Sequence, residues 1–322
     1  RCQTGEVMKH SGLSVLLILF SFLSLFIGVS DFTVADLFTG NQEGISILVI
    51  SRIPRLLTII MAGMSMSISG LIMQQITRNK FVSPTTAATI DSAKLGVLIA
   101  LLLFPGVSSL GKMLVVFMFA QVGTFLFVGI LRKIKVRNAI IVPLIGIMLG
   151  NIIDSLTTFL AYHFDLVQNV SSWLMGNFSM IVQGRYELLY LSVPLLIVAY
   201  IYAHQFTIAG MGEDFALNLG LNYERVVNLG VTIVALLSAL VIITAGRIPF
   251  LGLVVPNISA LYYGDNLQQS IGVTALLGAV FLLACDILGR VIIAPYEIPI
   301  GLTVGTIGSL LFLYLVIRGN SR

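Results

Sequence analysis

The sequence predicts an all-α membrane protein of about ten transmembrane helices, with two short broken helices and an inverted repeat. Of its 322 residues, 57% are hydrophobic and 10% are charged, whereas an ordinary soluble domain carries about 25% charged residues. Apolar runs of about 20 residues recur from Leu13 to Ile317, and a helix of that length crosses a hydrocarbon layer about 30 Å thick. Two shorter apolar runs contain or follow polar residues and proline. These three observations point to lipid as the solvent.

Ten apolar runs between polar, proline or glycine breaks are expected to form the spans. They cover residues 12–30, 53–76, 90–104, 113–131, 139–162, 186–203, 226–245, 250–263, 271–293 and 300–318. No small-residue cleavage site follows the first run, so we interpret it as a retained span and not as a signal peptide. Met8 begins a plausible natural start, Met-Lys-His, which leaves open whether residues 1–7 are native.

The basic residues predict the orientation. An even number of spans places both termini on one side, and Lys and Arg accumulate in cytoplasmic connections. With the termini inside, the inner segments hold twelve of the 18 Lys and Arg residues and the outer segments hold six. We therefore expect a multi-pass cell-membrane protein forming a single domain over residues 1–322. Its cytoplasmic parts include residues 1–11, the basic run 132–137 and residues 204–225.

The two short spans predict an internal repeat. The span at 90–104 follows the polar stretch TRNKFVSPTT, and the stretch Leu251–Tyr263 contains Pro256. Irregular backbone at membrane depth must line a cavity or be buried in protein. Both short spans come after one long span and before two more. Spans two to five and seven to ten therefore form one unit used twice in opposite directions, as in many transporters.

Several kinds of chemistry are excluded by the sequence. The segment GVSSLGK at 106–112 has phosphate-loop spacing, but Met113 stands where a magnesium-binding Ser or Thr belongs, so we expect no ATP hydrolysis by this chain. The three histidines, at positions 10, 163 and 204, lie far apart and predict no metal site. No Ser-His-Asp constellation is present on one side of the membrane. We expect no enzyme activity and no cofactor.

Three acids lie within or at the start of spans, where a charge is expensive: Asp91, Asp154 and Asp286. Asp286 stands four residues before Arg290, a spacing that allows an internal ion pair. Asp154 is the best candidate by depth for a proton relay, and its role stays open.

The inner segment GMGEDFALNLGLNYERV, residues 210–226, predicts a short amphipathic helix. Glu213 and Asp214 occupy its first turn, where the helix dipole favours acids, and Gly220 ends it. A second helical turn follows from Asn222. A rigid pair of helices that projects from the membrane suits a grip for a motor subunit, and an interfacial connector is the alternative.

On the outer side, Arg52 and Arg55 open the second span, and Arg290 closes the ninth. Arginines that extend toward the interface to anchor a helix are the ordinary explanation. Because basic residues are disfavoured outside, the cluster also suggests an acidic docking partner.

Four segments, in this order, resemble the FecCD family of permeases of ATP-binding-cassette importers for iron siderophores, haem and cobalamin. They are SRIPRLLTIIMAGMSMSISGLIMQQITRNKFVSPTT, GEDFALNLGLN, GRIPFLGLVVPNISALYYGD and CDILGRVIIAPYEIPIGLTVGTIG. The resemblance covers nearly the whole chain. It implies a ten-helix subunit of type II importer architecture that pairs with a second permease subunit, identical or paralogous, and encloses a pathway along their interface.

The resemblance also implies site residues. The coupling motif that fits a groove on the ATPase matches Gly212, Glu213, Ala216, Leu219 and Gly220, and the outer arginines that meet the binding protein match Arg52, Arg55 and Arg290. The gate or pathway region falls at Asn79, Pro84, Pro256 and Asn257. Here the chain departs from the family, which often has His in place of Asn257 and NPLA-like residues in place of the NKFV at 79–82.

We therefore expect a permease subunit that carries ferric siderophores by alternating access. Its implied partners are two cytoplasmic ATPase subunits, an extracytoplasmic substrate-binding protein, the siderophore complex and the lipid bilayer, with no nucleic acid. The alternatives are an ion-coupled secondary transporter that uses Asp154, a haem or cobalamin permease, and a receptor without transport. The sequence does not specify the siderophore.

Overall fold

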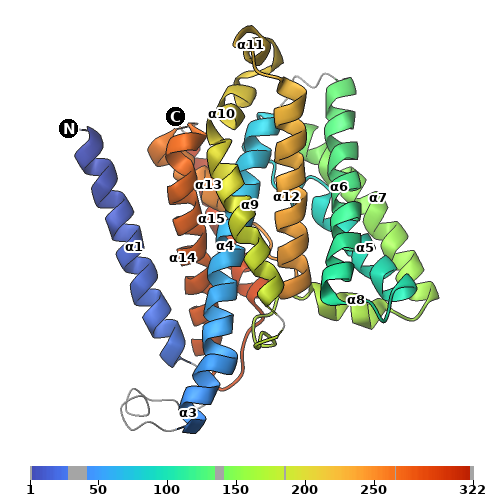
Figure 1. Cartoon of the computed structure of the whole chain (residues 1–322), viewed down its shortest axis with the longest axis vertical. Helices are drawn as coiled ribbons and strands as arrows, with labels where there is room; N and C mark the ends of the chain where they lie inside the picture. The colour runs from blue at the N-terminus through green and yellow to red at the C-terminus, as the bar shows by residue number, and fades with distance from the viewer. Residues whose placement is uncertain (1, 28–41, 135–140, 185, 265, 320–322) are drawn as a thin grey trace.

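The computed structural model describes residues 2–27, 42–134, 141–184, 186–264 and 266–319. Within these ranges the chain forms helices and connecting coil, and its only extended pairing is an isolated bridge between Met175 and Arg247. The helices run roughly along the long axis of the molecule (Figure 1). The predicted all-α fold class is therefore confirmed.

Each predicted span contains a helix within the described residues, and positions 28–30, 139 and 140 of the predicted spans lie outside those residues. The ten are α1 (Cys2–Phe26), α4 (Ile53–Thr77), α5 (Thr89–Leu103), α6 (Ser109–Ile134), α7 (Ile141–His163), α9 (Ser192–Ile201), α12 (Tyr223–Ala245), α13 (Leu251–Tyr263), α14 (Leu267–Val291) and α15 (Ile300–Gly319). Shorter elements join them: α3 (Gln42–Ile47), a π-helical turn (Leu48–Arg52), α8 (Val167–Leu174), a 3-10 turn (Glu187–Leu191), α10 (Ala203–Met211) and α11 (Glu213–Asn218).

Within the described residues, fewer than ten helices are long and apolar enough to cross a membrane. Among the described residues, six helices qualify, and the pair Glu187–Ile201 and Ala203–Met211, bent by 56°, could make a seventh. The apolar part of α1 and the whole of α13 are shorter than a full crossing. A count of ten crossings thus stays a prediction.

The sixth span differs from its predicted form. The single run 186–203 is divided into a 3-10 turn and α9, and α10 continues beyond it at the 56° bend. Pro256 also behaves differently from the prediction, because α13 runs through it without a break. Proline removes one backbone hydrogen-bond donor from the helix. The short helix α13 nevertheless continues through it, because the helix is buried and packs on α4.

The two halves of the chain show corresponding features that support the predicted repeat. In both, a short helix starts directly after a residue in the left-handed backbone region, Ala88 (φ 58°) before α5 and Phe250 (φ 59°) before α13. The packing partners also correspond. Helix α4 packs on α14 and α13, and its counterpart α12 packs on α6 and α5.

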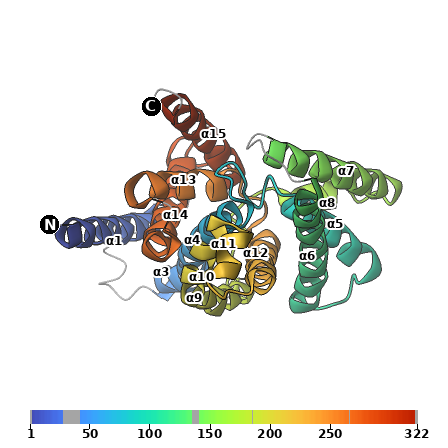
Figure 2. The same cartoon turned by 90° about the horizontal axis from the view of Figure 1, so that it is seen from above.

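The core lies along α4, α12 and α14, whose apolar windows are 78%, 72% and 61% buried. Glycines let the helices approach one another closely. A Cβ on Gly63 would lie 2.8 Å from the Cα of Ala279 in α14, and one on Gly70 would lie 2.6 Å from the Cα of Gly252 in α13. By contrast, α7 and α15 are only 22% buried. Seen from above, both stand on the same long side of the molecule (Figure 2).

The start of α1, the end of α15 and α11 lie at one end of the molecule, and α3 lies at the other (Figure 1). We call these the α11 end and the α3 end. The cytoplasmic placement of both termini and of the segment 204–225 stays a prediction.

Candidate functional sites

The α11 end presents a short helix fixed by two glycines. Gly212 (φ 122°) precedes α11 and Gly220 (φ 75°) follows it, and both need backbone angles that other residues rarely adopt. Ala216 is fully buried, whereas Phe215 and Leu219 are 48% and 58% exposed. Exposed apolar side chains on a projecting helix suit contact with another protein. The sequence-predicted coupling residues therefore lie on one small helix (Glu213 and Ala216) or directly beside it (Gly212, Leu219 and Gly220).

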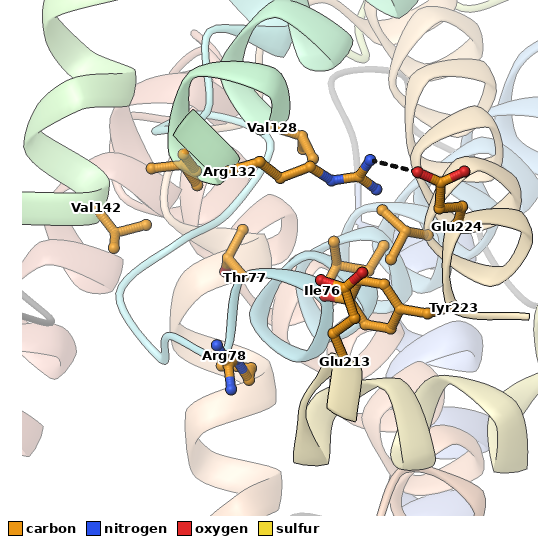
Figure 3. Close-up of a pocket in the computed structure, with 11 residues that line it drawn as sticks. Ile76, Thr77, Arg78, Val128, Arg132, Val142, Glu213, Tyr223 and Glu224 are labelled. Atoms are coloured by element: carbon orange, nitrogen blue, oxygen red, sulfur yellow. Dashed lines mark ion pairs between the residues drawn. The ribbon is translucent and has the colours of Figure 1, made fainter. Parts of the chain in front are cut away.

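A cavity of about 480 Å³ lies beneath α11, between the ends of α4 and α6 and the start of α12 (Figure 3). Its charged and polar lining includes Arg78, Arg132, Glu213, Tyr223 and Glu224. The Arg132 guanidinium lies 3.8 Å from the Glu224 carboxylate, which links α6 to α12. The sequence analysis did not single out this cavity, since its lining comes from five helices that are separate in the sequence, α4, α6, α7, α11 and α12.

The end of α4 touches the coupling segment directly. Arg78 ends α4 in the left-handed conformation, and a Cβ on Gly212 would lie 3.0 Å from its Nη1. Gln75, one turn earlier, lies closer still to Gly210, where an added Cβ would meet its Oε1. The residues that flank the start of α11 thus contact the end of α4, the most buried long helix.

The four predicted gate residues lie together. Asn257 Nδ2 donates to the backbone carbonyl of Lys80 at 2.8 Å and to that of Leu253 at 2.7 Å. Asn79, 4% exposed, accepts a 2.8 Å bond from the amide of Phe81. Pro84 Cδ comes within 3.4 Å of a Cβ placed on Gly252, four residues before Pro256. The structure thus brings the coil after α4 against α13.

At the α3 end, four charged side chains form a buried network. The Arg55 guanidinium lies 2.8 Å from Asp286 Oδ1 and donates to both carboxylate oxygens of Glu297, at 3.0 and 2.9 Å. Arg290 Nη2 lies 2.7 Å from Asp286 Oδ2. That last contact is an ion pair and not an aligned hydrogen bond, because Asp286 Oδ2 has no hydrogen-bond partner. The spacing-based pair of Asp286 with Arg290 is present, inside a larger network.

The end of α1 completes this network. Arg290 donates to the carbonyl oxygen of Ser24 at 2.9 Å and also contacts the Ser24 hydroxyl and the carbonyl of Ile27, and Arg52 donates to the carbonyl of Leu25 at 2.7 Å. Arg52 and Arg290 are 8% and 7% exposed, and the Arg55 side chain is 14% exposed. In the isolated chain, the arginines predicted to dock a partner are thus largely covered.

Glu297 connects the network to the coil before α9. Its carboxylate accepts a 2.6 Å bond from Ser179, which also bonds Asn177. Partial burial favours the protonated form of Glu297, but the Ser179 hydroxyl and the nearby Arg55 charge outweigh it and hold the pKa of Glu297 below its usual range. Sequence analysis missed this residue, because its partners Arg55 and Ser179 lie 242 and 118 residues away in the chain.

Asp154 is also paired. Lys94 Nζ of α5 lies 2.6 Å from Asp154 Oδ1 of α7, and the two side chains are 22% and 44% exposed. The acid predicted as a possible relay thus has a cationic partner from the short helix.

The sequence of this chain is similar to those of known transport proteins. The model of the FecCD transport family matches residues 16–318. The petrobactin import system permease YclN of Bacillus subtilis (strain 168) is 60% identical over 97% of this chain and 98% of its own length. The ferric-anguibactin permease FatD of Vibrio anguillarum is 40% identical over 92% of the chain and 94% of its own length.

A solved structure gives the same assignment for the fold. An inward-facing metal-chelate type ABC transporter matches with a TM-score of 0.81 at 25% identity, covering 96% of this chain and 98% of that one. The family match spans the α11 segment, the gate coil and the charged network. This chain therefore belongs to the FecCD transport family.

Proposed function

We propose that this chain is the permease subunit of an ATP-driven importer that moves ferric siderophores across the cell membrane by alternating access. The observation that carries the proposal is α11, a short helix at one end of the bundle with exposed Phe215 and Leu219 and with a left-handed glycine at each side. Such a projection gives a separate ATPase a rigid surface to grip. The two most similar relatives named above are siderophore permeases.

The cargo class follows from those relatives. One is named as a petrobactin import permease and the other as a ferric-anguibactin transport permease. Because the 60% identity is to the petrobactin permease, we propose a petrobactin-like ferric chelate as the first candidate cargo. Haem and cobalamin are the alternatives within the family.

The partners are a second permease subunit, two ATPases and an extracytoplasmic binding protein. Helices α7 and α15, the least covered of the long helices, suit the contact with the second permease. For the binding protein we propose the α3 end, where Arg52, Arg55 and Arg290 lie. In the isolated chain, Asp286 and Glu297 form ion pairs with Arg55 and Arg290, and Arg52 donates to the Leu25 carbonyl. Docking through these arginines therefore requires the network to rearrange.

A secondary transporter is the competing function. It would use Asp154 as a titrating relay, and the 2.6 Å pair with Lys94 gives that carboxylate a fixed counter-ion instead. Loss of uptake in Asp154→Asn while the ATPase stays bound and active would favour the competing function.

The coupling assignment is tested with Glu213→Arg and Gly220→Pro. We expect both variants to reach the membrane and to lose ATP-dependent ferric-siderophore uptake, since each alters the surface that the motor contacts. Gly264→Pro is the matched control, because Gly264 has a similar left-handed angle (φ 69° against 75°), also donates its amide to the preceding turn and has an equally open Cβ position. Normal uptake in both α11 variants would remove the assignment.

A further inference from the structure

Helix α7 carries a polar stripe on a face that the rest of the chain leaves open. Its apolar window is only 22% buried, and Asn151, Ser155 and Thr158 are exposed, with Asp154 partly exposed between them. The spacing of these residues, i, i+3, i+4 and i+7, places them on one side of a helix. The stripe occupies the second half of a helix that is long and apolar enough to cross a membrane.

A charged pair lies within this stripe at membrane depth. Asp154 is the fourteenth of the 23 residues of α7, and the Lys94 ammonium 2.6 Å away lies at the same level. The Lys94 side chain is 22% exposed and the Asp154 side chain is 44% exposed, so both can contact the medium or protein that lies against α7. Charged groups in a membrane segment almost always face other protein or a water-filled cavity, because hydrocarbon solvates them poorly.

The short helix α5 reaches the stripe through a glycine. A Cβ on Gly150 would lie 3.2 Å from Asp91 Cγ, so the glycine makes room for the Asp91 carboxylate against α7. Asp91 and Lys94 stand one turn apart on α5. Two acids and a lysine from two helices therefore gather at one level of the molecule, next to Asn151.

The uncovered face of α15 has a different character. Its exposed side chains include Leu302, Leu310, Leu313 and Tyr314, which suit lipid or a packed helix partner. The apolar windows of α7 and α15 are equally uncovered, each being only 22% buried, so exposure alone does not explain the polar stripe. Water is the medium that fits it.

We propose that the α7 stripe lines the water-filled pathway of the importer and that Lys94 is a specificity-determining residue, which exchanges its Asp154 partner for the anionic groups of a passing ferric chelate. Ferric complexes of catecholate and carboxylate ligands carry net negative charge. A partly exposed ion pair contributes little net stability, so the lysine can change partners without a large penalty. The inference rests on the proposed function for the identity of the cargo, but not for the presence of water.

The first experiment measures water access in the assembled importer in membranes. In a background with Cys2 and Cys285 replaced by Ala, Ser155→Cys is compared with Leu156→Cys, a neighbouring residue that is also exposed but points to another side of α7. We expect a charged, membrane-impermeant methanethiosulfonate to modify Ser155→Cys at least about tenfold faster, since the reagent reacts only where water solvates the thiolate. Equal rates at the two positions would overturn the pathway assignment.

The second experiment isolates the charge of Lys94. The rate ratio of an anionic to a cationic methanethiosulfonate at Ser155→Cys is measured with Lys94, with Lys94→Gln and with Asp154→Asn. Removing one positive charge should lower the ratio by roughly threefold or more, and removing the negative charge should raise it. A ratio that neither substitution changes would overturn the role of Lys94, even if water access is confirmed.

These outcomes can be separated from a failure of the proposed function. Labelling needs no transported cargo, so it reports on the pathway alone. Uptake of an anionic and of a neutral ferric chelate is then compared in Lys94→Gln, where selective loss of the anionic chelate supports the proposal and equal loss of both contradicts it. If Ser155→Cys is labelled but no ferric chelate is imported by the parent protein, the proposed cargo is wrong and the water-lined stripe stands.

Discussion

The buried network at the α3 end predicts a large effect of one substitution, Asp286→Ala. The Asp286 side chain is 2% exposed and lies between the guanidinium groups of Arg55 and Arg290, at 2.8 and 2.7 Å. Removing one partner of a buried ion pair typically destabilises a protein by about 3–5 kcal/mol, because the other charge stays buried without compensation. Since Arg55 keeps Glu297 and Arg290 keeps its bonds to α1, we expect the lower end of that range.

The chain contains its own reporter for this loss. Cys285 is 1% exposed, and with Cys2→Ser it is the remaining thiol of the sequence. A fluorogenic maleimide reacts with it only when the helix bundle opens. A loss of about 3 kcal/mol should raise the modification rate about a hundredfold, since each 1.4 kcal/mol is a factor of ten. Denaturant unfolding followed by circular dichroism checks that the whole bundle is affected.

Two variants control the interpretation. Glu224→Ala removes the acid of the exposed pair with Arg132, which is 3.8 Å apart and has side chains 43% and 74% exposed, so its effect should stay below about 1 kcal/mol. Asp286→Leu combined with Arg290→Met replaces the buried pair with apolar groups and should recover most of the stability. If Asp286→Ala reacts within about threefold of the parent and of Glu224→Ala, a difference of about 0.7 kcal/mol, the network is not a buried charge cluster.

Further outcomes follow from two other sites. The pKa of Glu297 is lowered in the folded chain, so its stabilising contribution is complete above the ordinary glutamate pKa of 4.5 and is lost as the pH falls below that value. Denaturation midpoints measured from pH 6 to pH 3 should therefore fall less steeply in Glu297→Gln than in the parent, and parallel curves would contradict the assignment. Gly70→Ala should destabilise the protein by about 1–3 kcal/mol or more, because its Cβ would lie 2.6 Å from the backbone Cα of Gly252. Thermal unfolding in detergent checks this against Gly129→Ala, where nothing lies within 4 Å of the new Cβ, and equal stability of the two variants would argue against close packing of α4 on α13.

Much of the fold could be predicted, because a segment that crosses lipid must be a long run of apolar residues and such runs are visible in the sequence. Apolar runs gave a helix at each of the ten expected places, and the two short runs gave α5 and α13. The 56° bend between α9 and α10 could not be predicted, because no proline or glycine stands at the break and tertiary packing decides it. The expectation that Pro256 breaks its helix was wrong, because a proline inside a short buried helix need not end that helix.

Local motifs located the candidate sites, but pairing across the sequence stayed out of reach. The four-residue spacing of Asp286 and Arg290 predicted their contact, whereas the partners of Arg55 lie 231 and 242 residues away in the chain. The same holds for Lys94 and Asp154, 60 residues apart. A single sequence has no signal for contacts of this range, so the outer arginines were expected to be open to a partner. Instead, Arg55 and Arg290 are paired with acids, and Arg52 donates to a backbone carbonyl of α1.

The attachment of α1 has a consequence for any shortened form of this protein. Its last turn offers the carbonyl oxygens of Ser24, Leu25 and Ile27 to Arg52 and Arg290. Without that turn, two guanidinium groups would be left at the membrane boundary with fewer oxygen acceptors. The first helix thus helps to solvate the cations of its neighbours, and deleting it to simplify expression should weaken the far end of α14 before it affects the α11 end.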